Sequence, residues 1–315
     1  MRELARTWVS FSAVSFESEP PPRGPQPVIQ KRRRGALAPT LITLGVLVVL
    51  VLILASFWTD ILWFDQLGYL QVYRTQLVTR TLLFLLGLII MAGGVFASLY
   101  VAYRSRPIYA PAPSGPQASL ERYRETIEPL RRLLLFVVPV ILGLFGGSAV
   151  AQHWHTVLLW LNRQSFGTKD AQFGLDIGFF VFTLPMLEFV VGFLVATVFL
   201  SAIAAVVTHY LYGGMRLQGG GVRFTVTARA HLCVLAAIFL FLRAITYWLD
   251  RYSLTIRDSE RITGLTYTDA NVVVTSKGIL AAIAFMIGVL FVVAAFTDRW
   301  RLLPLYGVGL LLVSW

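Results

Sequence analysis

The chain has 315 residues, of which 57% are hydrophobic and 14% are charged, with a mean hydropathy of +0.72. An average soluble domain carries about 25% charged residues, so this composition excludes a water-soluble globular fold. The formal net charge is +11, and the single cysteine, Cys233, excludes an internal disulfide and a four-cysteine metal site.

Apolar residues occur in runs of about 18 or more, the length that crosses a roughly 30 Å hydrocarbon layer as a helix. The sequence therefore predicts an all-α fold, a polytopic α-helical membrane protein with about seven transmembrane helices. The predicted spans cover about residues 40–58, 82–103, 133–151, 179–207, 230–249, 278–296 and 302–315. The last run is only about 21 Å of helix, so we expect the seventh span to be incomplete and the transmembrane helical domain, residues 37–315, to be the N-terminal part of a longer protein.

The segments between spans differ in charge from one side of the membrane to the other. Residues 1–36 are predicted to be a disordered basic tail, because they contain Lys31-Arg32-Arg33-Arg34 but no apolar run of signal-peptide type. Together with this tail, the second, fourth and sixth connections carry most of the Lys and Arg residues. The positive-inside rule makes this side cytoplasmic, so we expect a cytoplasmic N-terminus and a C-terminal end directed outward. The predicted partners are the lipid bilayer and anionic lipid headgroups on the cytoplasmic face, not nucleic acid.

Three connecting segments have the composition of helices that lie on the membrane surface. These are the aromatic-rich residues 59–69, residues 152–166 and residues 120–130. The longest outer connection, residues 251–277, contains Val272-Val273-Val274, for which a short strand is one alternative.

The same outer connection offers oxygen ligands. Asp258, Asp269 and Asn271 are candidates for a cation or docking site. No EF-hand spacing is present, so a solvated loop is the competing interpretation.

Two ionisable residues lie within predicted spans: Glu188 in the fourth and Arg243 in the fifth. Ionisable side chains inside hydrocarbon are costly and often functional. Since both residues lie nearer the outer ends of consecutive antiparallel spans, we expect them at similar depth, forming an intramembrane ion pair through direct or water-bridged contact. The pair either locks two helices together or lines a path for protons or a substrate.

The remaining motifs predict contacts between helices and no reactive or metal-binding site. Gly93-Gly94 and Gly146-Gly147 predict a close approach of helices. The histidines fall on both sides of the membrane and cannot all share one ion: His153 and His155 lie outside, His209 and His231 inside. The sequence predicts no catalytic residues, no metal site and no cofactor.

Four motifs resemble one family. They are residues 57–69 (FWTDILWFDQLGY), 166–180 (FGTKDAQFGLDIGFF), 247–252 (YWLDRY) and 267–271 (YTDAN). Together they resemble the bacterial uncharacterised protein family 0182, over about residues 40–315. The resemblance implies about seven N-terminal spans followed by a large extracytoplasmic domain, and it implies no reaction, cofactor or catalytic residue.

These features favour a non-enzymatic membrane anchor or scaffold, or an accessory subunit in the bacterial cell envelope with an envelope protein as partner. The alternative is a transporter or lipid-handling protein with a cavity around Glu188 and Arg243. A membrane-embedded enzyme that uses the outer acids Asp65, Asp176 and Asp250 is a third hypothesis.

Overall fold

The computed structural model describes residues 37–106, 128–218, 221–258 and 263–297. The basic tail, most of the predicted surface helix at 120–130 and the predicted seventh span lie outside these residues. The described helices are α1 (Leu37–Gln66), α2 (Leu70–Arg104), α4 (Arg131–Gln152), α5 (Trp154–Leu161), α6 (Leu184–Leu211), α7 (Val226–Ser253) and α8 (Val274–Phe296).

Within the described residues, six helical stretches are long and apolar enough to cross a membrane. The all-α class is confirmed, and the protein is a multi-pass membrane protein. A small antiparallel hairpin between α6 and α7, made of β1 (Met215–Gln218) and β2 (Gly221–Phe224), is the departure from this pattern that the sequence did not predict.

The chain divides into two compact units, Met1–Gln66 and Leu67–Trp315. The first contains α1, a continuous helix of about 45 Å at about 1.5 Å per residue, whose side chains are largely exposed. Residues 59–66 are the last turns of α1, so the prediction of a separate surface helix there is wrong. The helix ends because Gly68 adopts a φ of 74°, a left-handed conformation that glycine adopts without steric cost.

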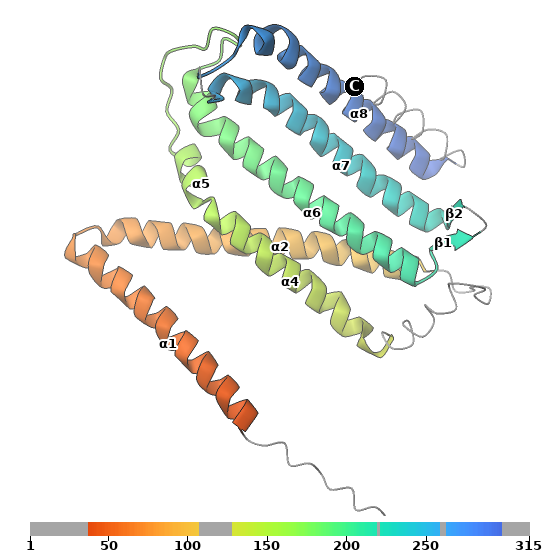
Figure 1. Ribbon diagram of the computed structural model, residues 1–315, viewed down its shortest axis with the longest axis horizontal. Coiled ribbons are helices and arrows are strands. Elements are labelled where there is room, and N and C mark those ends of the chain that lie inside the picture. The colour runs from red at the N-terminus through yellow and green to blue at the C-terminus, as the bar shows by residue number, and fades with distance from the viewer. Residues whose placement is uncertain (1–36, 107–127, 219–220, 259–262, 298–315) are drawn as a thin grey trace, which may run out of the picture. The chain divides into compact units, whose positions relative to one another are not determined.

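In the second unit α2 packs against α4 and α6, and α6, α7 and α8 lie side by side in that order (Figure 1). The contact between α2 and α4 depends on glycine. A Cβ added to Gly147 would lie 2.6 Å from the Phe84 carbonyl oxygen, and one added to Gly146 would lie 2.6 Å from the Met91 sulfur. Close approach at Gly146-Gly147 is therefore confirmed. Of Gly93-Gly94 it is confirmed for Gly94, whose added Cβ would lie 3.0 Å from Cγ2 of Thr197 on α6, but a Cβ added to Gly93 would have nothing within 4 Å.

The region before α8 is helical, so the predicted alternative of a strand at 272–274 is wrong. A π-helical turn, Asp269–Val273, leads directly into α8. Its start is a reciprocal cap: the Asp269 backbone N–H donates to the Thr266 hydroxyl at 3.0 Å, and the Thr266 N–H donates to the Asp269 carboxylate at 3.2 Å. This capping box satisfies N–H groups at the start of the helix, so the valines continue into a span.

Residues 152–166 contain the short helix α5 that the sequence predicted, at Trp154–Leu161. It is followed by a loop that leads through a second π-helical turn, Phe179–Thr183, into α6.

Candidate functional site

Four charged side chains of α6, α7 and α8 lie toward the C-terminal half of α7, together with a tyrosine and a serine. We call this group the polar cluster. It consists of Glu188 on α6, Arg243, Tyr247, Asp250 and Ser253 on α7, and Lys277 on α8.

Glu188 and Arg243 each have a different nearest partner. The Glu188 carboxylate accepts a hydrogen bond from the hydroxyl of Ser253, the last residue of α7. The Arg243 guanidinium lies 5.0 Å from the centre of the Tyr247 ring, one turn further along the same helix. Ser253 is about 15 Å of helix away from Arg243, at about 1.5 Å per residue, so Glu188 is held toward the end of α7.

Both residues nevertheless line one pocket of about 170 Å³, together with Thr246 and Asp250. Within the described part of the chain, no contact between Glu188 and Arg243 reaches ion-pair distance. A water-bridged pairing across this pocket stays a prediction.

Asp250 and Lys277 form the ion pair that the structure does place here. The Lys277 ammonium lies 2.7 Å from the Asp250 carboxylate and 5.4 Å from the centre of the Tyr247 ring. Tyr247 thus has two cations, Lys277 and Arg243, near its ring, an arrangement that contributes about 0.5–2 kcal/mol per cation–π contact. With Glu188 and Asp250 as the acids, the polar cluster has no formal net charge.

Sequence reasoning assigned Asp250 and Lys277 to the outer connection, because the fifth apolar run ends just before Asp250 and the sixth begins just after Lys277. The structure extends α7 to Ser253 and begins the next helical stretch at Asp269, so both side chains belong to helices. The Thr266-x-x-Asp269 capping pattern was the available signal that helix begins well before Lys277.

At the opposite end of α6 and α7, two histidines meet. The Nε2 atom of His209 lies 3.2 Å from the Nδ1 atom of His231, and the rings are nearly perpendicular. His209 is 1% exposed. The sequence placed both residues at this end but gave no sign of their contact. Among the described residues, no group of three His, Cys, Asp or Glu side chains could hold a metal ion.

Asp176, one of the acids in the enzyme hypothesis, holds the loop before α6. Its carboxylate accepts hydrogen bonds from the Ser165 hydroxyl at 2.5 Å and from the N–H groups of Gly178 at 2.7 Å, Gly167 at 3.0 Å and Phe166 at 3.1 Å. These bonds, that of Ser165 above all, lower the pKa of Asp176 to about 2. Asp176 is therefore a structural anion with its acceptor sites engaged.

Each residue of the candidate cation or docking site forms a hydrogen bond with a residue close to it in sequence. Asp258 accepts a hydrogen bond from Thr263, Asp269 caps its helix through Thr266, and the Asn271 amide donates to the Tyr267 carbonyl. A joint role for Asp258, Asp269 and Asn271 stays a prediction.

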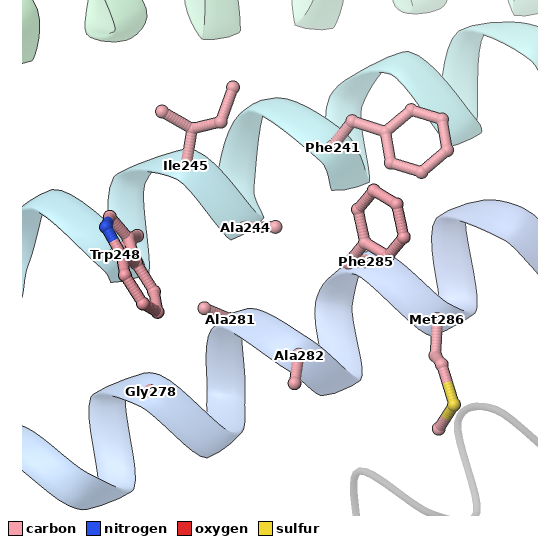
Figure 2. A pocket seen from close by; sticks show the side chains of 9 residues that line it. All are labelled: Phe241, Ala244, Ile245, Trp248, Gly278, Ala281, Ala282, Phe285 and Met286. Carbon is pink, nitrogen blue, oxygen red and sulfur yellow. The ribbon is translucent and has the colours of Figure 1, made fainter.

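The described residues form at least two apolar grooves between helices. The first, of about 530 Å³, lies between α7 and α8. Figure 2 shows that Phe241 and Phe285 approach each other at one end and that Trp248 stands at the other, near Gly278. The two phenyl rings are 5.2 Å apart. The second groove, of about 460 Å³, lies among α2, α4 and α6; we call it the α2–α4–α6 groove.

Comparison with known proteins gives one consistent result. The family model described as "Uncharacterised protein family (UPF0182)" matches residues 37–315. A UPF0182 protein of Kineococcus radiotolerans is 53% identical over 267 residues, which are 84% of this chain and 26% of the relative. One from Arthrobacter sp. is 44% identical over 297 residues, and one from Thermobifida fusca is 42% identical over 301.

These two alignments cover 94% and 96% of this chain and 29% of each relative. The chain thus spans less than a third of the length of the curated relatives it matches. No solved structure matches the chain.

Proposed function

The chain belongs to the uncharacterised protein family UPF0182, and from this premise we propose that it is a non-enzymatic membrane anchor or scaffold in the cell envelope. In this proposal the N-terminus is cytoplasmic and the C-terminal end is directed outward. The end of the helices that carries the polar cluster then faces outward, where it supports an extracytoplasmic domain or an envelope partner.

The polar cluster is the observation that carries this proposal. The cluster holds two acids and two bases on three helices, and each has a partner: Asp250 and Lys277 form an ion pair, Glu188 accepts a hydrogen bond from Ser253, and Arg243 lies over the Tyr247 ring. Partners of this kind fix the relative position of helices, because removal of any one leaves a charge uncompensated in a partly buried site.

The size of the pocket beside the cluster also supports a scaffold. At about 170 Å³ it has room for a few water molecules, at about 30 Å³ each. Ligand sites commonly measure about 300–1,000 Å³. The pocket therefore suits bound water between fixed helices better than an organic substrate.

The second candidate function is a transporter or lipid-handling protein that uses this pocket. It is favoured by one observation: Glu188 and Arg243, charges of opposite sign set within spans, line the same pocket. A proton or small ion would need no larger volume.

Access to Glu188 distinguishes the two functions. In the full-length protein with Cys233→Ser, which removes the buried native thiol, Glu188→Cys is labelled with a membrane-impermeant thiol reagent from either side of sealed vesicles. Tyr267→Cys, at a position that is 86% exposed, and Arg223→Cys on the hairpin report the two sides. A scaffold gives labelling of Glu188→Cys only from the side that labels Tyr267→Cys. Labelling from both sides would contradict the scaffold and support a transport path.

A further inference from the structure

The α2–α4–α6 groove is lined almost entirely by carbon. Leu99 of α2, Val138 of α4, and Ile203 and Val207 of α6 form its walls. The hydroxyl of Thr208, which also lines it, donates to the Ala204 carbonyl of its own helix at 2.8 Å. The groove is not a buried core, because Ile203 and Val207 are 45% and 59% exposed. In a membrane these side chains face lipid.

The groove has the length of one leaflet. Its lining runs from Leu200 along α6 to Tyr212, the residue that follows α6, and along α4 from Leu134 to Leu142. At about 1.5 Å per residue these stretches are about 18 Å and 12 Å long. Half of a roughly 30 Å hydrocarbon layer is about 15 Å. The groove therefore reaches from the end of the helices to about the middle of the bilayer.

The end of the groove is aromatic and basic. The Tyr103 and Tyr212 rings, both in its lining, lie edge to face at 5.3 Å, and tyrosine is typical of the headgroup level. The Arg106 guanidinium lies 4.5 Å from the centre of the Tyr103 ring. Arg104, at the end of α2, and Arg132, at the start of α4, are exposed and lie one and two residues in sequence from the lining residues Tyr103 and Leu134.

We propose that this groove binds one acyl chain of an anionic phospholipid whose phosphate is held by Arg104, Arg106 and Arg132. The guanidinium group matches the geometry of phosphate oxygens, and the apolar walls match an acyl chain over the depth of one leaflet. The inference uses the proposed orientation in one respect: with the basic side in the cytoplasm, the lipid comes from the inner leaflet.

Lipid retention tests the proposal. Full-length protein in detergent is incubated with equal amounts of phosphatidylglycerol and phosphatidylcholine that carry the same oleoyl chains, and bound lipid is counted by native mass spectrometry. We expect phosphatidylglycerol to be preferred. A basic residue near an anionic surface contributes about 1 kcal/mol, or about fivefold, so the triple variant Arg104→Gln/Arg106→Gln/Arg132→Gln should lower that preference at least tenfold.

Filling the groove is the second arm. Ala204→Trp places an indole in the lining and should abolish retention of both lipids at this site, whereas Ala196→Trp, at an exposed position on the same helix, should not. Arg74→Gln/Arg80→Gln, at exposed positions toward the other end of α2, is the matched control for charge.

The proposal is overturned if wild type retains the two lipids equally, or if the controls reduce retention as much as the groove variants. It is also overturned if Ala204→Cys, treated with an added thiol oxidant in the membrane, forms a disulfide with Ala204→Cys of a second copy, because a protein helix would then occupy the groove. Should Ala204→Trp fail to fold, the arginine variants decide. Because retention in detergent does not depend on orientation, a failure here is separate from any failure of the topology measured by thiol labelling.

Discussion

The Lys277 ammonium of α8 and the Asp250 carboxylate of α7 are 2.7 Å apart, with side chains about a third exposed. They join two membrane helices at the level where Glu188 of α6 bonds to Ser253. A charged side chain that is about one third exposed is only partly hydrated. Removal of its partner therefore lowers the stability of the protein more than removal of a partner at a fully exposed surface.

Asp250→Asn should therefore destabilise the protein by about 1–3 kcal/mol, between the values typical of exposed and buried pairs. The measurement is thermal unfolding in detergent, extended to a double-mutant cycle with Lys277→Met. The double variant should lose less than the sum of the single losses. Additive losses would mean that the pair contributes nothing to stability.

Gly147→Ala should destabilise the packing of α2 against α4 by about 1–3 kcal/mol, the usual cost of overpacking. The reason is that the new methyl group would lie 2.6 Å from the Phe84 carbonyl oxygen, which belongs to backbone that cannot rotate away. Gly93→Ala is the matched control, since nothing lies within 4 Å of its added Cβ, and it should be neutral or slightly stabilising because alanine favours helix. Equal effects of the two substitutions on the unfolding temperature would contradict the observed packing.

Gly214→Ala should disturb the buried histidine pair. A Cβ at this position would lie 2.8 Å from Nδ1 of His209, and that ring is 1% exposed and cannot move aside. We expect a loss of about 1–3 kcal/mol in unfolding free energy. In a His209→Ala background, Gly214→Ala should lower the unfolding free energy very little, because the clashing ring is gone. An equal loss in both backgrounds would mean that the cost comes from the backbone at Gly214 and not from the His209 ring.

Asp176→Asn should loosen the loop before α6 in a pH-dependent way. The folded-state pKa of about 2 lies below the ordinary 3.8. Ionised Asp176 therefore stabilises the folded loop above about pH 4, and this contribution is lost as the pH falls through 4 toward 2. Amide hydrogen exchange at Gly167 and Gly178, which donate to the carboxylate, should be faster in the variant at neutral pH. The difference from wild type, compared at each pH, should shrink toward pH 2; a constant difference would exclude titration of Asp176 as its cause.

Part of the candidate site was visible in the sequence. Glu188 and Arg243 stand out because a charge within an apolar run is conspicuous, and the two do line one pocket. The sequence also predicted that Glu188 and Arg243 lie at similar depth along their helices, and the structure shows an offset between them. Glu188 bonds at Ser253, well beyond the backbone position of Arg243, because the axial offset between helices depends on packing contacts that no single span contains.

The Asp250–Lys277 ion pair and the His209–His231 contact were not predicted, for the same reason. Each is a pairing between helices, set by their rotation and offset. Asp250 and Lys277 also lie just outside the apolar runs, in turns where the helices continue.

The sequence by itself determined that this is a multi-pass helical membrane protein. The length of an apolar run is a local property, and a helix is one of the few structures that can satisfy its backbone hydrogen bonds inside hydrocarbon. Only the tertiary structure decided which charges meet, which glycines face a neighbouring helix and where grooves open. Those outcomes depend on the rotation of each helix about its axis and on its offset along its neighbour. Close contacts such as the one at Gly147 fix both, and the hydropathy of a single span does not.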